Sequence, residues 1–210
     1  GGSYSSPNKI IDFYGDRTGN LVTVASVAAS AGTSPTGEEV TKVNDGSPDT
    51  KYLNTTGPNS GLTFTLTAAA VMDSMLLVTR TNDDIWQWDP KTWQVFGSNT
   101  NATWSDSNWV PLGSGNTNLA DARGSVSVVT FSNSTAYKFY KVVFPTTKGT
   151  NNGQAYVHIS EVDLFRAPQV KLGGMPDLRT LGSEGWTRRM WFDLTTNDNA
   201  TLATLQTASL

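Results

Sequence analysis

Apolar and polar residues alternate along several short segments of this chain. The segment 62–67, Leu-Thr-Phe-Thr-Leu-Thr, alternates without a break, which predicts a strand with one buried face. The segment 74–79 is more uniformly apolar, which predicts a strand near the centre of a sheet. Further β-capable runs lie at 21–29, 92–97, 125–131, 136–144 and 155–165. Helical periodicity is weak, so the pattern favours an all-β antiparallel sandwich or jelly roll.

The pattern changes towards both ends of the chain. Residues 1–20 are mostly polar and turn-rich, and residues 167–210 begin with a Pro- and Gly-containing stretch typical of a linker. We therefore expect an N-terminal segment (1–20), one β-sandwich domain (21–166) and a C-terminal extension (167–210). The extension would pack on the domain or on a partner, and a homo-oligomer or larger assembly formed through it stays open.

Composition and charge exclude several classes of function. The formal net charge is −3 and no basic cluster is present, which does not fit a nucleic-acid-binding protein. No run of about 18 apolar residues exists, so membrane insertion is not expected. The chain has no Cys, and its one His, His158, is more typical of a packed or exposed sheet residue than of a catalytic base. Without a Gly-x-Ser-x-Gly turn or a zinc ligand set, we do not expect an enzyme.

The loop around Asp45 has the composition of a cation-binding turn. Asp45, Ser47, Asp49 and Thr50 place four oxygen-bearing side chains within six residues, next to Gly46. Oxygen ligands on a sharp Gly-containing turn suit Ca²⁺. From these residues alone, an ordinary solvated turn is the simpler interpretation.

Glu161 is the second acidic residue of interest. By the period-two rule it shares a strand face with Val157, Ile159 and Phe165. A carboxylate on an apolar face is costly unless it is paired or bound to a metal. Calcium ligation is one explanation, and a solvent-exposed strand end or a bulge that turns the side chain are the others.

Two tryptophans, Trp86 and Trp88, lie in a long polar loop. Aromatic rings at the rim of a loop stack on the apolar face of a sugar, while neighbouring polar groups bond its hydroxyls. Arg80, Asn82 and Asp83 lie close by in the sequence, so these five residues form a candidate ligand site. The alternative is that one or both rings fold beneath the loop as a small satellite core.

The order of these motifs resembles the discoidin family, the coagulation factor V/VIII C-type domains with a galactose-binding-like jelly roll. The resemblance covers residues 22–165. The matching pieces are Asn44-Asp45-Gly46 with Thr50, Asn82-Asp83, the run from Asp89-Pro90 to Asn99, Trp104, the strand 140–144 and the closing segment 159–165. The chain departs from the family pattern at Lys51-Tyr52, where relatives commonly carry a Trp, and at 85–88.

The resemblance implies an eight-stranded antiparallel β-sandwich whose members are mostly non-catalytic and bind a sugar or a membrane surface through loops at one end. It also implies a structural calcium ion. By position, the ligands would be the side chains of Asp45, Thr50 and Glu161 with backbone carbonyls around Val43 and Ser47. Because the chain has no disulfide and no basic patch, binding to anionic lipid is not expected.

We therefore expect a non-catalytic binding module for carbohydrate or a cell-surface glycan. Trp86 and Trp88 would stack on the sugar, and Arg80, Asn82 and Asp83 would hydrogen-bond it. The partner would be a glycan or a surface protein, and the module would act outside the cell or at its surface. The alternative is a structural virion or surface-assembly protein, for example a phage capsid decoration or tail component, that uses the same fold for protein–protein docking.

Overall fold

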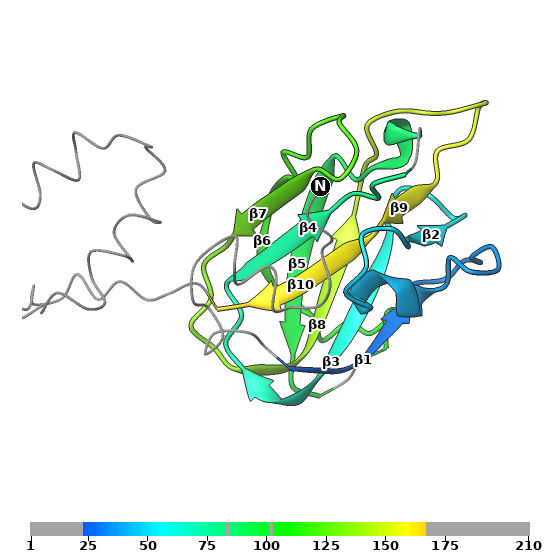
Figure 1. Cartoon of the computed structure of the whole chain (residues 1–210). Helices are drawn as coiled ribbons and strands as arrows, with labels where there is room; N and C mark the ends of the chain where they lie inside the picture. The colour runs from blue at the N-terminus through cyan, green and yellow to red at the C-terminus, as the bar shows by residue number, and fades with distance from the viewer. Residues whose placement is uncertain (1–22, 83–84, 101–102, 167–210) are drawn as a thin grey trace, which may run out of the picture. The chain divides into compact units, whose positions relative to one another are not determined.

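The computed structural model describes residues 23–82, 85–100 and 103–166 (Figure 1). Over these residues the structure is all β, with antiparallel strand pairs and no α-helix, as the alternation of apolar and polar residues predicts. None of the described residues belongs to a helix long and apolar enough to span a bilayer. The segments 1–20 and 167–210 lie outside the described residues, so the domain limits stay predictions.

Ten strands form three sheets within the described residues. The five-stranded sheet has the order β1-β3-β8-β5-β6, the three-stranded sheet has the order β10-β4-β7, and β2 pairs with β9. The bounds of the first five strands are Val24–Ala29 (β1), Tyr52–Asn54 (β2), Ser60–Ala70 (β3), Ser74–Val78 (β4) and Thr92–Ser98 (β5). The bounds of the others are Val110–Asn116 (β6), Val126–Thr130 (β7), Tyr137–Phe144 (β8), Val157–Ile159 (β9) and Glu161–Phe165 (β10).

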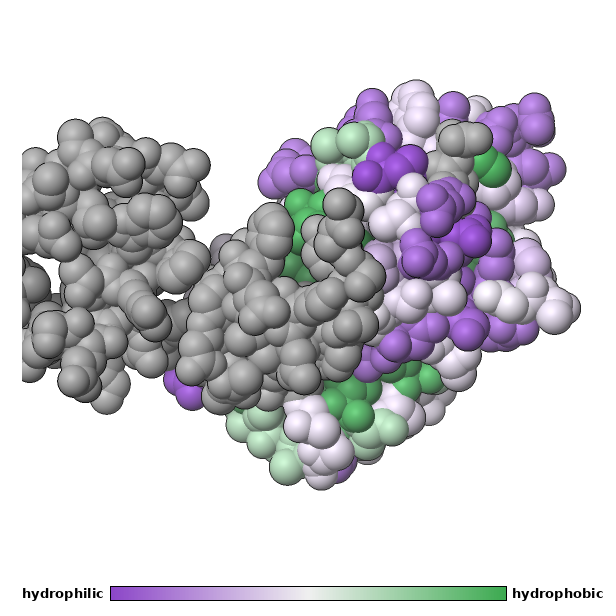
Figure 2. Space-filling view, viewed as in Figure 1, coloured by the Kyte–Doolittle hydropathy of each residue, from purple (hydrophilic) through white to green (hydrophobic). Residues whose placement is uncertain are grey.

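The two larger sheets pack face to face, with β10, β4 and β7 lying over the five-stranded sheet (Figure 1). Alternate residues of each strand point into the space between the sheets, which is why the period of two is visible in the sequence. The buried core includes Leu62, Phe64, Leu66, Met75, Leu77, Val95, Tyr140, Val142, Phe144, Val162 and Leu164. Because the inward-facing strand residues fill the core, a ligand site is expected in the loops at the ends of the sandwich. Figure 2 shows mainly hydrophilic and near-neutral residues at the end that carries β2 and β9.

Two observed strands, β2 and β6, are absent from the sequence prediction. β2 has only three residues, too few for a pattern to appear. β6 contains Pro111, Gly113 and Gly115, which have low strand propensity. It forms at the edge of the sheet against β5, where a Pro and small residues are tolerated. The five-stranded and three-stranded sheets together have eight strands, the number that the resemblance implies, and the short β2–β9 pair lies outside these two sheets.

The segment predicted as one strand at 155–165 is two strands in different sheets. β9 pairs with β2 and β10 pairs with β4, and the chain changes partner at Ser160. Val157 and Ile159 belong to the core before the change, and Val162 and Leu164 belong to it afterwards. The alternation therefore shifts by one residue at Ser160. The expectation that Glu161 shares a face with Val157 and Ile159 was wrong, although Glu161 is still buried.

Candidate functional site

The Asp45 loop follows the 3₁₀ helix η2 (Val40–Asn44) and turns at Gly46, whose φ of 75° lies in the left-handed region that glycine adopts without strain. The Ser47 N–H donates to Asp45 Oδ1 at 3.0 Å. The Thr50 hydroxyl lies 2.9 Å from both carboxylate oxygens of Asp45. The Asp45 carboxylate thus organises the loop from within.

The same loop is joined to the start of β10. The Ser47 N–H also donates to Glu161 Oε1 at 2.9 Å, although the two residues are 114 positions apart. In addition, the side-chain amide of Asn44 donates to Asp163 Oδ1 at 3.1 Å. The structure therefore brings four of the five predicted calcium ligands together, namely Asp45, Ser47, Thr50 and Glu161. The fifth, Val43, lies in η2 with its side chain in the core.

Two buried carboxyl groups beside this loop have raised pKa values. Burial raises the pKa of Glu161 to about 9, and the negative charges of Asp163 and Asp45 contribute to the shift. Burial also raises the pKa of Asp163 to about 6. Asp163 escaped the sequence analysis, although its place two residues after Glu161 on the same strand was a usable signal.

The donor set fits a hard cation such as Ca²⁺, because it combines carboxylate, hydroxyl and backbone oxygens. Among the described residues, no group of three His, Cys, Asp or Glu side chains has the arrangement of a metal site. An ion at this loop would therefore depend on the Thr50 hydroxyl and on backbone carbonyls as well as on carboxylates. The calcium site stays a prediction.

Arg80 and Asn82 follow β4 and turn towards the loop that contains Asp49. Arg80 Nε donates to the Asp49 carbonyl at 2.9 Å, and Asn82 Nδ2 lies 3.3 Å from the Asp49 carboxylate. Arg80 also lies 4.0 Å from a carboxylate oxygen of Glu38. Both side chains thus support the Asp45 loop. Asp83 lies outside the described residues, and a ligand contact by any of the three stays a prediction.

Trp88 is half-buried at the end of the 3₁₀ helix η3 (Trp86–Trp88). The centroid of its ring lies 4.8 Å from that of Tyr156 and 5.9 Å from that of His158. Its indole N–H donates to the carbonyl of Gln154 at 2.9 Å. These contacts agree with the alternative in which a ring packs beneath the loop, and they leave only part of Trp88 open to a ligand.

Trp86 lies at the other end of η3 and is 38% exposed. Trp86 lines an open pocket of about 380 Å³. The other lining residues are Lys91, Asn116, Thr117, Asn118, Leu119, Asp121 and Lys148. The pocket residues come from three separate parts of the chain, 86–91, 116–121 and 148, so no local sequence pattern points to the whole pocket. We name it the Trp86 pocket.

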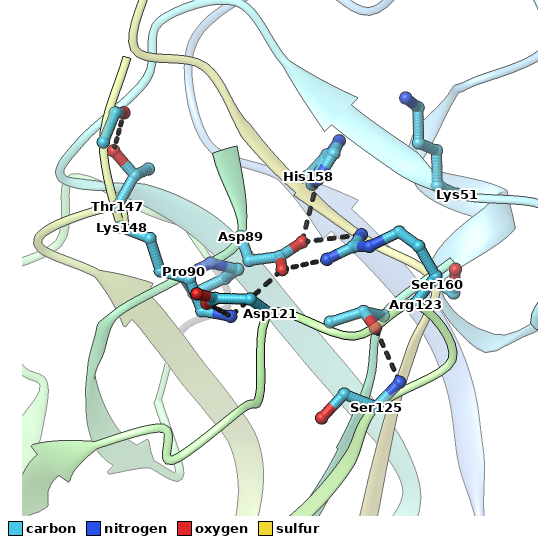
Figure 3. A network of polar contacts seen from close by, with 12 residues as sticks. Lys51, Asp89, Pro90, Asp121, Arg123, Ser125, Thr147, Lys148, His158 and Ser160 are labelled. Carbon is cyan, nitrogen blue, oxygen red and sulfur yellow. Dashed lines mark hydrogen bonds and ion pairs between the residues drawn. The ribbon is translucent and has the colours of Figure 1, made fainter. Parts of the chain in front are cut away.

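A buried ion network shares Lys148 with the Trp86 pocket (Figure 3). The Asp89 carboxylate accepts hydrogen bonds from both terminal nitrogens of Arg123, with Nη1 at 3.2 Å. His158 Nε2 lies 2.9 Å from Oδ1 of Asp89, and Lys148 Nζ donates to Oδ2 at 3.3 Å. Burial works to raise the pKa of Asp89, but hydrogen bonds and charge from His158 and Arg123 outweigh it and hold that pKa below its usual value. His158 is therefore a packed residue, as expected, with a partner that the sequence did not suggest.

Lys148 also connects this network to the wall of the pocket. Its ammonium group donates to the carbonyl of Ala120 at 2.8 Å and to the carboxylate of Asp121 at 3.0 Å. Asp121 is 66% exposed, so one side of its carboxylate stays open to solvent. Through Lys148, the network thus fixes the position of the Asp121 carboxylate at the edge of the Trp86 pocket and leaves the pocket open.

No protein-family model matches the chain, and no curated protein matches it. Solved structures do match. Part of a chain with the CBM32-1, CBM32-2 and M60 catalytic domains of Clostridium perfringens ZmpB matches with a TM-score of 0.61 at 14% identity, over 75% of this chain and 16% of that chain. The family 32 carbohydrate-binding module (CBM) of C. perfringens NanJ, in complex with galactose, matches with a TM-score of 0.54 at 14% identity, over 70% of this chain and 98% of that chain.

The CBM32 of AlyQ, in complex with 4,5-unsaturated mannuronic acid, matches with a TM-score of 0.51 at 17% identity, over 70% of this chain and 98% of that chain. The fold is that of the family 32 carbohydrate-binding modules. The predicted β-sandwich jelly roll is thereby confirmed, whereas membership of the discoidin family itself stays a resemblance. At these identities the likeness concerns the fold, and the ligand must be argued from the site.

Proposed function

We propose that the protein is a non-catalytic carbohydrate-binding module that recognises a glycan in the Trp86 pocket. The observation that carries this proposal is an exposed indole beside amide, carboxylate and ammonium groups in one open pocket. A sugar ring has an apolar face that stacks on an aromatic ring and hydroxyls that need polar partners. Structures of the same fold that hold galactose or an unsaturated mannuronic acid support a sugar ligand.

The pocket is prepared for binding by contacts made beneath it. Trp88 holds η3 through Tyr156 and Gln154, which fixes the helix that carries Trp86. Lys148 holds Asp121, whose open carboxylate side can accept hydrogen bonds from two sugar hydroxyls. Groups that are already fixed lose little freedom on binding. Because the pocket is open and takes about one sugar ring, we expect a Kd on the order of 1 mM for a monosaccharide.

This proposal changes the expected roles of the other candidate residues. Trp88 supports the site more than it stacks on the sugar. Arg80 and Asn82 shape the Asp45 loop through Asp49, away from the residues that line the Trp86 pocket. A module of this kind acts outside the cell or at its surface.

We also propose that a structural calcium ion is held by the side chains of Asp45, Thr50 and Glu161 with backbone carbonyls around Val43 and Ser47. The ion supplies positive charge next to carboxylates that otherwise repel one another. Its role would be to hold the Asp45 loop against the start of β10. Sugar recognition in the Trp86 pocket does not require it.

A glycan array followed by titration calorimetry tests the sugar site. The wild-type protein is expected to bind at least one glycan class, and Trp86→Ala is expected to weaken that binding at least about tenfold, or about 1.4 kcal/mol. Trp104→Ala is the matched control, because it removes an indole that does not line the pocket. Absence of glycan binding by the wild type, or unchanged binding by Trp86→Ala, would contradict the proposal.

A further inference from the structure

We propose, resting on the glycan site above, that the Trp86 pocket prefers an acidic sugar and that Lys91 recognises its carboxylate. The ligand class is a uronate residue in a polysaccharide. The inference rests on how the two ammonium groups at the pocket, those of Lys91 and Lys148, are used within the protein.

Lys148 has no donor left for a ligand. Its three ammonium hydrogens are taken by Ala120 at 2.8 Å, Asp121 at 3.0 Å and Asp89 at 3.3 Å. It is also only 10% exposed. Lys148 therefore contributes positive charge to the pocket while its contacts stay within the protein.

Lys91 is different, because its backbone is fixed and its side chain is exposed. Its N–H donates to the carbonyl of Thr146 at 2.9 Å, and its own carbonyl accepts the N–H of Thr117 at 2.9 Å. The Lys91 ammonium group has no ion pair or hydrogen bond with any described residue. The backbone thus presents at the pocket one ammonium group whose charge is available to a ligand.

The charge balance around the pocket also favours an anion. Lys91, Lys148 and Arg123 face two carboxylates, those of Asp89 and Asp121, which leaves a surplus of one positive charge. The whole chain has the opposite sign, with a formal net charge of −3. A local surplus of this sign steers and holds a negatively charged ligand.

The other lining residues restrict the anion to a sugar acid. The exposed Trp86 ring requires a flat apolar partner, which a phosphate or sulfate ion lacks. Asn116, Asn118 and the open carboxylate of Asp121 suit hydroxyl groups, and Asp121 would repel a ligand with several charges. A ring with hydroxyls and a single carboxylate satisfies all of these groups, and a uronate has that chemistry.

The test compares polymers that differ only in the carboxylate. Polygalacturonate, polyglucuronate and polymannuronate are each measured against the same polymer after reduction of its carboxyl groups, by affinity electrophoresis and calorimetry with the full chain. We expect at least one uronate polymer to bind three- to fivefold more tightly than its reduced form, as for a partly exposed ion pair. We expect this preference to fall between 20 and 500 mM NaCl.

Two substitutions at one position assign the preference to Lys91. Lys91→Met is expected to abolish the preference while keeping binding to the reduced polymer, and Lys91→Arg is expected to keep it. Lys138→Met is the matched control, because it removes one positive charge from β8, outside the residues that line the pocket.

The outcomes separate this inference from the proposed function. Equal binding of every acidic and reduced pair, or a preference that survives Lys91→Met, would overturn the uronate inference. If Trp86→Ala still weakened binding to a neutral glycan at least about tenfold in that case, the sugar site would stand. A wild-type protein that bound no acidic, reduced or arrayed glycan would overturn both.

Discussion

Replacement of Asp89 by Asn is expected to be among the most damaging single changes in the described part of the chain. Asp89 is fully buried, and its carboxylate contacts the side chains of Arg123, Lys148 and His158. These partners are themselves only 16%, 10% and 2% exposed. Asn keeps the size of Asp but has no negative charge, and one of its two oxygens becomes a donor.

The size of the destabilisation depends on the buried positive charges that lose their partner. Breaking a buried ion pair by removing one partner costs about 3–5 kcal/mol, because the remaining charge is buried without compensation. Here the remaining charges belong to Arg123 and Lys148, so we expect the free energy of unfolding to fall by about 3–5 kcal/mol. For a domain of this size that corresponds to a fall in melting temperature of roughly 10 °C.

The matched control is Asp121→Asn. Asp121 contacts the same Lys148 ammonium group, at 3.0 Å, but is 66% exposed. Removing an exposed partner is expected to cost at most about 1 kcal/mol. Urea denaturation of the wild type and both variants measures the difference. If Asp89→Asn cost no more than Asp121→Asn, the view that burial decides the strength of this network would be refuted.

The network also predicts a dependence of stability on pH. The pKa of Asp89 in the folded protein is lowered by His158 and Arg123, against the effect of burial. Between this pKa and the unfolded value of about 3.9, the unfolded state binds a proton that the folded state does not, so stability rises with pH. The contribution is fully present above about pH 4 and is lost as the pH falls through the folded pKa. Asp89→Asn should lack this component of the acid transition.

Two further predictions concern the Asp45 loop and the β3–β8 pair. Since the pKa of Glu161 without a bound ion is about 9, the folded state holds a proton that the unfolded state releases above about pH 4, and stability should fall as the pH rises towards 9. Calcium should therefore raise the melting temperature more at pH 8 than at pH 5, and Glu161→Gln should remove the effect; a melting temperature unchanged by calcium or chelator at pH 8 would contradict the proposed site. Gly61→Ala would place a Cβ atom 2.0 Å from the carbonyl oxygen of Val142, so we expect a loss of about 2 kcal/mol or more in urea denaturation. Gly149→Ala is its control, since the nearest atoms lie at 3.6 Å, and an equal loss in both variants would show that close strand packing is not the cause.

The sequence predicted the main strands because each has one face in the core. β3, β4, β5, β7 and β8 all lie where apolar runs or alternation placed them. β6 was missed because its residues are small and its place is set by β5. The change of sheet at Ser160 was missed because a shift of one residue depends on which strands are available as partners, and this information is distant in the sequence.

One of the two candidate sites could be predicted from the sequence, and the other could be predicted only in part. The contact between the Asp45 loop and Glu161 was predictable. A carboxylate in an apolar strand is costly unless it has a partner, and the order of motifs that resembles the discoidin family pointed to the Asp45 loop as that partner. The Trp86 pocket was only partly predictable. Trp86 could be recognised as a loop aromatic, and Lys91 follows it in the same loop. Asp121 and Lys148 come from other loops, and only the folded sheets bring them to Trp86.

The place of β10 has a consequence for how this domain is made. β10, the last strand among the described residues, pairs with β4, and Glu161 at its start contacts Ser47. It therefore completes structure that begins more than eighty residues earlier in the chain. Because the chain leaves the ribosome N-terminus first, the core strands β3 and β4 emerge long before β10 is available to pair with β4. Domains dominated by such distant pairings fold slowly, in milliseconds to seconds. We therefore expect this sandwich to fold only after residue 165 has been released, as one event rather than strand by strand during synthesis.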